Sequence, residues 1–191
     1  MSDVASREES MRLSRFEFLL MNNPVRRYLQ ENYEFRIFKE LIKACNVNLN
    51  NKVIMDAGCG SGYSSELITK TYCPQKVIAF DIMPEQIALA RKRKINVDFF
   101  VGDVTNINIP DNTCDAVFVF GILHHIPEWR KALKEIDRVL KAGGVALIEE
   151  PRHLFDWAEL EEGIRMAKLN ILQMKKFYLG YFRGYICQKV Q

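Results

Sequence analysis

The chain has 191 residues, of which 48% are hydrophobic and 27% charged, a balance typical of one globular domain. This composition excludes disorder, collagen-like repeats and coiled coil. No apolar stretch reaches the roughly 18 to 20 residues that cross a bilayer, and the first residues lack the basic and apolar segments of a secretory signal. We therefore expect a single cytoplasmic domain. Five cysteines without a CxxC pair predict reduced thiols and no zinc site.

The net charge of +3 is unevenly distributed along the chain. No Asp or Glu follows Glu162, so residues 165–191 carry +6. Residues 1–164 carry −3, because 21 Lys and Arg residues there face 24 Asp and Glu residues. A basic C-terminal segment rich in aromatic residues is thus joined to a nearly neutral remainder.

The first 50 residues are predicted to form a helical cap. Apolar side chains recur at three- and four-residue steps in residues 24–45, and Pro24 suits a first helical position. A shorter helix is expected at residues 11–21. Its apolar residues either form a lid over a ligand or pack as an ordinary helix: Phe16, Phe18, Leu19 and Leu20.

Strands and helices are predicted to alternate through residues 51–150. The predicted strands are residues 53–57, 76–81, 97–101, 115–120 and 145–149, and the predicted helices are residues 63–72, 84–94 and 128–141. Nearly continuous apolar strands in such an order predict an α/β fold with a mostly parallel, doubly wound sheet. Sheets of this kind bind ligands at the carboxyl ends of their strands.

A glycine-rich loop follows the first predicted strand. Gly58, Gly60 and Gly62 alternate with other residues, Asp56 precedes them, and a helix begins directly after. Such a loop lets backbone N–H groups approach a ligand at the positive end of a helix. The spacing differs from the GxGxxG of dinucleotide-binding folds, and the GxxxxGKS of a P-loop is absent.

This motif, followed by others in the same order, resembles the class I S-adenosylmethionine-dependent methyltransferases, whose loop reads acidic-x-Gly-x-Gly-x-Gly. The resemblance covers residues 41–150 and extends to the Leu123-His124-His125-Ile126 sequence of the small-molecule subgroup. It implies a Rossmann-like fold and S-adenosylmethionine as cofactor. In that family the loop holds the methionine end of the cofactor, with the acidic residue near the amino group or bracing the turn. The residues implied there are Asp56, Gly58, Cys59, Gly60 and Gly62.

The same resemblance implies the other cofactor contacts. Asp81 ends the second strand and would hold both ribose hydroxyls, as a carboxylate can accept two hydrogen bonds from a diol. Ile82 is expected against the adenine face, and Asp103 and Val104 at the adenine edge. Phe120, which ends the fourth strand, is assigned to the cofactor site as well.

Two histidines are the candidate catalytic bases. His124 and His125 follow the fourth strand and face the expected acceptor pocket, where either could deprotonate a phenol or an enol. The alternative is that each caps or packs under the helix that starts near Pro127. Further candidates end the fifth strand: Glu149, Glu150 and His153.

Absent motifs narrow the acceptor to a small molecule. Residues 120–123 read Phe-Gly-Ile-Leu, where DNA amino-methylating enzymes of this class have a Pro-Pro tetrad. The Pro-Cys nucleophile of cytosine methylation is also missing, and no acidic cluster suggests a magnesium site. We therefore expect a small-molecule acceptor, with a lipid-like molecule as one candidate, no metal and no nucleic-acid substrate.

The C-terminal segment, residues 151–191, departs from the family. One helix is predicted over residues 157–177, which leaves too few residues for the usual C-terminal hairpin, so five or six strands are expected instead of seven. The exposed edge would then be covered by the tail or by a second subunit in a homodimer. The tail's aromatic and basic residues could instead contact an anionic membrane surface, a lipid-like acceptor or nucleic acid, or simply close the core.

Two functions remain after these considerations. The first is methyl transfer from S-adenosylmethionine to a small organic acceptor, at an oxygen, nitrogen or carbon atom. The alternative is a catalytically idle member that keeps the fold as a binding or scaffolding module, a reading supported mainly by the short C-terminus. An NAD-dependent oxidoreductase is disfavoured by the spacing of the glycine loop.

Overall fold

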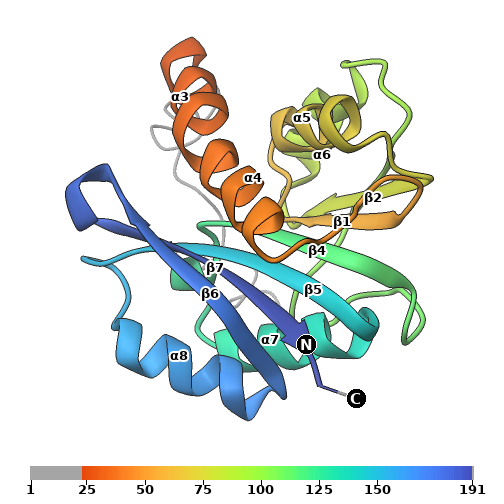
Figure 1. Ribbon diagram of the computed structural model, residues 1–191. Coiled ribbons are helices and arrows are strands. Elements are labelled where there is room, and N and C mark those ends of the chain that lie inside the picture. The colour runs from red at the N-terminus through yellow and green to blue at the C-terminus, as the bar shows by residue number, and fades with distance from the viewer. Residues whose placement is uncertain (1–22, 191) are drawn as a thin grey trace, which may run out of the picture.

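A single mixed sheet organises the computed structural model, which describes residues 23–190 (Figure 1). Its strand order is β3-β2-β1-β4-β5-β7-β6; the first five pair in parallel, and β7 runs antiparallel to both β5 and β6. The strands are β1 (Val53–Ala57), β2 (Lys76–Asp81), β3 (Asp98–Val101), β4 (Cys114–Phe120), β5 (Leu140–Pro151), β6 (Leu169–Phe177) and β7 (Phe182–Lys189). The predicted α/β class with a mostly parallel sheet is confirmed.

Helices cover both faces of the sheet (Figure 1). One face carries α3 (Pro24–Leu29), the π-helix η1 (Gln30–Glu34), α4 (Phe35–Ala44), α5 (Tyr63–Tyr72) and α6 (Pro84–Arg91). The other carries α7 (Trp129–Val139) and α8 (Trp157–Met166), and two short 3₁₀ turns are η2 (Leu123–His125) and η3 (Tyr178–Gly180). No helix in the described part of the chain is long and apolar enough to cross a membrane.

Alternation along the central strands divides the core in two. On β4, Phe118 and Phe120 face α4, whereas Val117 and Val119 face α7 and α8. All four are at most 5% exposed, which explains why this strand is apolar on both sides. Burial on both faces fixes the carboxyl end of β4 firmly beside that of β1.

The number of strands was predicted too low, because residues 169–189 form the hairpin that the sequence did not reveal. The single helix expected over residues 157–177 is wrong: α8 ends at Met166, and β6 begins at Leu169. Between them Lys168 adopts a left-handed conformation with φ +62°, which stops the helix at a residue type that gives no such signal. The strand β5 is therefore an inner strand and not the edge.

The N-terminal cap, as far as it is described, packs on the sheet as three consecutive helical pieces. Phe35, Phe38 and Leu41 of α4 are each 1% exposed and lie over β4 and β7. A π-turn precedes them, so the helix expected from Pro24 to Cys45 changes its winding at Gln30–Glu34. The helix expected at residues 11–21, including its apolar residues, lies outside the described residues.

Candidate cofactor-binding site

The glycine loop joins β1 to α5 in a conformation that only glycine adopts easily. Gly58, Gly60 and Gly62 have φ of +72°, +53° and +77°, in the left-handed region. The N–H groups of Gly58 and Cys59 both donate to the carbonyl of Phe80, each at 2.9 Å. These bonds fix the loop to the end of β2.

The surroundings of the three glycines differ. A Cβ added at Gly58 would come within 2.8 Å of the Ile122 side chain, and one at Gly62 within 2.9 Å of Ala90. At Gly60 a Cβ would meet nothing within 4 Å. Two of the glycines therefore allow close packing within the protein, whereas the middle one faces the open pocket.

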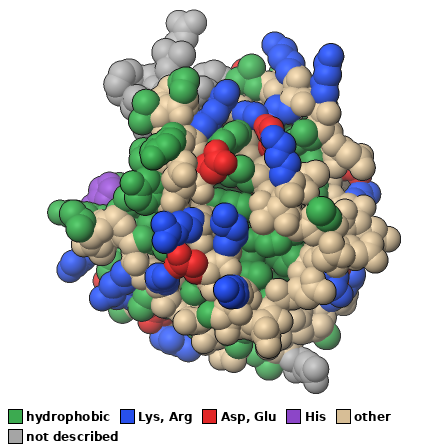
Figure 2. Space-filling model, turned by 45° about the horizontal axis from the view of Figure 1, so that its top comes forward, with side chains coloured by type: hydrophobic (Ala, Val, Ile, Leu, Met, Phe, Trp, Pro, Cys, Tyr) green, Lys and Arg blue, Asp and Glu red, His purple; other side chains and the backbone are tan. Residues whose placement is uncertain are grey.

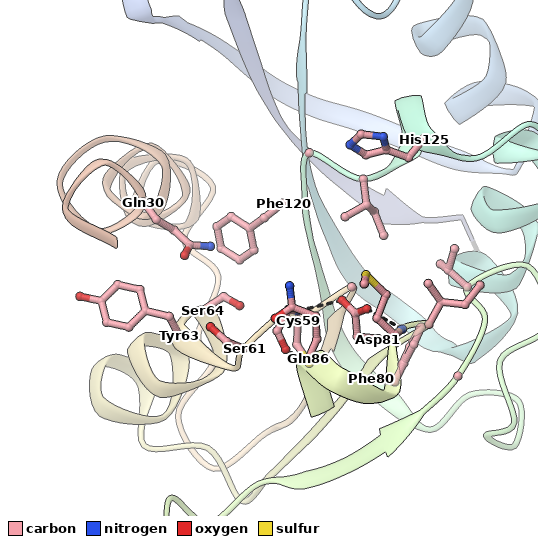
Figure 3. Close-up of a pocket in the computed structure, with 18 of the residues that line it drawn as sticks. Gln30, Cys59, Ser61, Tyr63, Ser64, Phe80, Asp81, Gln86, Phe120 and His125 are labelled. Carbon is pink, nitrogen blue, oxygen red and sulfur yellow. Dashed lines mark hydrogen bonds between the residues drawn. The ribbon is translucent and has the colours of Figure 1, made fainter. Parts of the chain in front are cut away.

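Asp81 is the last residue of β2, and its side chain lies at the centre of the pocket (Figure 3). Its Oδ2 accepts a hydrogen bond from the N–H of Gly60 and its Oδ1 one from the N–H of Met83, both at 2.9 Å. Burial raises the pKa of Asp81, and the backbone donors partly oppose this. The carboxylate thus has fixed positions for both oxygens while still lining the cavity.

The acidic residue ahead of the loop has a different environment. Asp56 is fully buried and does not line the pocket. Its Oδ2 accepts hydrogen bonds of 2.6 Å from the hydroxyls of Ser64 and Ser65, in the first turn of α5. Burial raises its pKa to about 6, despite these two donors. Of the two roles expected for Asp56, this position is compatible with bracing the loop against the helix.

The turn after β3 is held by its own acidic residue. Asp103 Oδ1 accepts from the N–H of Thr105 at 2.7 Å, and Oδ2 accepts from the Thr105 hydroxyl at 2.8 Å. Both Asp103 and Val104 line the pocket, and so do Ile82 and Phe120. The apolar and polar groups expected around an adenine ring are therefore brought to one cavity.

The pocket collects most of the predicted residues and several that the sequence did not indicate. Gly62 and His124 are absent from its lining, as is Asp56. The helices α3 and η1 contribute three residues for which no motif existed: Arg26, Arg27 and Gln30. The amide of Gln86, on α6, lines it as well (Figure 3). Only helical spacing linked the first three residues in the sequence, since Gln30 follows Arg26 by four residues and Arg27 by three.

The two neighbouring histidines have different positions. His124 Nδ1 lies 2.7 Å from Oε2 of Glu150, whose Oε1 accepts from the N–H of Leu123 at 2.7 Å. His125 lines the pocket, and the two rings are 4.0 Å apart between centroids. Figure 3 shows the His125 ring across the cavity from Asp81. Of these two adjacent residues, His124 is therefore held by the buried carboxylate of Glu150, whereas His125 faces the cavity.

A buried cluster of charged residues connects the N-terminal helix to the end of β5. Arg26 Nη1 donates to Glu34 Oε1 at 2.8 Å, and Glu34 lies within hydrogen-bonding reach of Glu149. The two carboxyl groups are 5% and 1% exposed. Burial raises both pKa values, and the negative charge of Glu34 raises that of Glu149 further. A hydrogen bond between two carboxyl groups requires a proton on one of them.

The pocket fits S-adenosylmethionine on two observations. The open space above Gly60 allows a ligand to approach the backbone of the loop. Gln86 is 2% exposed, and its Oε1 has no hydrogen-bond partner among the described residues. A buried amide oxygen of this kind needs a donor, and an amino group of the cofactor would supply one.

Comparison with known proteins agrees with this fit. Residues 55–148 match the family model described as "Methyltransferase domain". A fatty-acid O-methyltransferase of Mycolicibacterium smegmatis is 27% identical over 143 residues, covering 74% of this chain and 52% of that protein. A phthiotriol/phenolphthiotriol dimycocerosates methyltransferase of Mycobacterium ulcerans is 28% identical, with coverages of 74% and 53%. The chain spans about half the length of these relatives.

Solved structures show the same fold. A SAM-dependent methyltransferase from Aquifex aeolicus superimposes with a TM-score of 0.78 at 20% identity, over 94% of this chain and all of the other. The family match and the structural similarity agree with the sheet and the glycine loop described above. Residues 55–148 form a methyltransferase domain of the class I S-adenosylmethionine-dependent type, which implies S-adenosylmethionine as the cofactor.

Proposed function

We propose that this protein transfers the methyl group of S-adenosylmethionine to a small, lipid-like acceptor. The observation that carries the proposal is one pocket onto which the glycine loop, Asp81 and His125 all open. In it Asp81 would hold the ribose hydroxyls, and the loop backbone around Gly60 would hold the methionine end. Asp103, Val104 and Gln86 would surround the adenine.

The reaction asks little of the protein beyond positioning. When bound, the sulfonium of the cofactor supplies an activated methyl group and leaves as a neutral thioether. The chain must hold the acceptor atom about 3 Å from the methyl carbon, exclude water, and remove a proton only when the acceptor is protonated. We assign the removal of that proton to His125; its position in the pocket lining supports this choice, whereas His124 contacts Glu150.

A lipid-like acceptor is supported by the pocket's lining and by the relatives. Phe120, Ile122 and Ile126 are apolar residues that line the same pocket as His125. The two curated relatives are named for a fatty acid and for phthiotriol, which are both lipids. An acceptor with an apolar chain would bury that chain against these residues.

The alternative of a catalytically idle member loses its main argument. That reading depended on a missing hairpin, and β6 and β7 are both present in the sheet. Nothing else in the described residues favours it.

Two measurements test the proposal. Titration calorimetry with S-adenosylhomocysteine should show binding, and its absence at millimolar ligand would refute the cofactor site. Incubation with S-adenosylmethionine and separate acceptors, a long-chain fatty acid and a long-chain alcohol or phenol, should release S-adenosylhomocysteine together with a methylated lipid. Cofactor binding without product from any lipid acceptor would favour the idle alternative.

A further inference from the structure

Exposed apolar side chains gather at the tip of the β6–β7 hairpin and on the adjoining N-terminal helix. We call this region the tip surface; its exposed members are Val25, Tyr28, Tyr33, Leu179 and Tyr181. Leu179 is completely exposed, and Tyr181 is 60% exposed. Figure 2 shows hydrophobic side chains along one side of the molecule, next to a group of Lys and Arg side chains. Single exposed apolar residues are ordinary, but such a group at a protruding turn indicates a contact surface.

The tip surface is held in place by aromatic contacts. The rings of Tyr33 and Tyr178 stack with centroids 5.1 Å apart, and the Tyr178 hydroxyl donates to the carbonyl of Leu29 at 3.4 Å. The ring of Phe182 packs against that of Tyr178, with 5.3 Å between the ring centroids. Leu179 therefore projects from a supported turn, with φ +55°, and buries nothing within its own chain.

Basic residues flank the tip surface along α4 and β6. Five exposed cations lie on these two elements, which contact each other: Arg36, Lys39, Lys43, Lys175 and Lys176. Among them Glu40 is the acidic residue, and it pairs with both Arg36 and Lys175. This flank therefore carries a net charge of +4 beside the apolar tip.

The tip surface also adjoins the cofactor pocket. Arg26, Arg27 and Gln30 line the pocket from the same helical segment that contacts the tip through Leu29 and Tyr33. One side of this helix therefore faces the pocket and the other faces the hairpin.

We propose that the tip surface docks on an anionic lipid layer, with Leu179 and Tyr181 among the lipid headgroups and the basic flank on the phosphates. Apolar and aromatic side chains beside clustered Lys and Arg are the combination that binds such interfaces. A nucleic acid fits less well, because the most exposed residue is Leu179, which cannot stack on a base. Docking itself does not depend on the proposed function. The proposal rests on that function in one respect only, namely that the lipid layer would supply the acceptor.

Flotation with vesicles tests this directly. The full chain should bind vesicles of phosphatidylcholine and phosphatidylglycerol, in about a 3:1 ratio, more tightly than phosphatidylcholine alone, and salt should weaken the binding. Leu179→Ser with Tyr181→Ser should weaken it at least tenfold. Lys39→Gln with Lys176→Gln should weaken it about 25-fold, since each lysine near an anionic surface contributes a factor of about five.

Matched controls use exposed residues far from the tip. Met166→Ser, at the end of α8, and Lys134→Gln, on α7, should leave vesicle binding unchanged. Equal losses in the controls, or no binding to anionic vesicles by the unaltered chain, would overturn the proposal. So would binding to a single-stranded oligonucleotide that the tip variants weaken while vesicles fail to bind. S-adenosylhomocysteine calorimetry on the same samples separates this outcome from failure of the proposed function, because none of the altered residues lines the pocket.

Discussion

The carboxylate of Asp81 accepts a hydrogen bond of 2.9 Å from the backbone N–H of Gly60, 21 residues earlier in the chain. The end of β2 and the glycine loop after β1 therefore form one unit. A ligand that uses the loop backbone also meets a carboxylate whose position is already fixed, so little ordering is left to binding.

Removal of that carboxylate should weaken cofactor binding. Asp81→Ala deletes the acceptor proposed for the ribose hydroxyls and frees the N–H of Gly60, so we expect at least a tenfold loss of S-adenosylhomocysteine affinity, or about 1.4 kcal/mol. Calorimetry measures it. Asp98→Ala, which removes an exposed carboxylate paired with Lys76, is the control and should bind normally. Unchanged affinity in Asp81→Ala would contradict the ribose assignment.

The glycines of the loop should separate binding from stability. Gly60→Ala faces open space, so beyond about 1 to 2 kcal/mol of backbone strain its main effect should be on cofactor affinity. Gly58→Ala carries similar strain and also a 2.8 Å clash with Ile122, so it should lower the free energy of unfolding more. Urea unfolding and calorimetry on both variants test this. Equal destabilisation by the two would show that the space at Gly60 does not matter.

The role of His125 should depend on the acceptor. A carboxylate is already ionised at neutral pH, whereas a hydroxyl must lose a proton, a step worth about 10² to 10⁴ in rate. His125→Ala should therefore reduce kcat for an alcohol or phenol but spare a fatty acid. His153→Ala, an exposed histidine outside the pocket lining, should change neither. Loss of both activities would instead indicate a positioning role.

Asp56 should make stability depend on pH. Its folded pKa of about 6 lies above the ordinary 3.8, so folding favours the protonated form. That contribution is complete below about pH 4 and is lost as the pH rises through about 6, up to about 3 kcal/mol. Asp56→Asn keeps an acceptor for Ser64 and Ser65, so its free energy of unfolding should rise relative to the wild type over this interval. Urea unfolding at about pH 4 and about pH 6 measures the difference in free energy of unfolding between Asp56→Asn and the wild type. The control Asp98→Asn should show no comparable rise.

The buried Glu34 and Glu149 should also make the folded protein less stable as the pH rises. Both folded pKa values are raised, so their stabilising contribution is present at low pH and declines as the pH rises through the folded values. Glu149→Gln can donate to Glu34 without a shared proton, and should be more stable than the wild type at pH 8. Thermal unfolding at pH 5 and pH 8 tests this, and a larger gain at pH 5 would contradict it.

Local patterns determined much of the cofactor-binding half of this protein. The strand over residues 53–57 and the helix over residues 63–72 have the predicted bounds, because both follow from short-range periodicity. The glycines and Asp81 were likewise visible, since a loop between strand and helix needs particular residues at fixed spacing. The Leu169–Phe177 strand was not visible: its alternation is broken by an irregularity after Ile171, and its partner β7 comes later in the chain.

Only the tertiary structure decided the remaining features. His124 and His125 are equivalent in the sequence, and the turn of η2 directs one to Glu150 and the other to the pocket. Arg26 reaches the pocket because α3 packs across it, far along the chain from the loop. Such arrangements depend on contacts between distant segments, which residue periodicity does not encode. The basic segment, residues 165–191, likewise contains two paired strands with an apolar tip, because β7 pairs with β5 in the sheet.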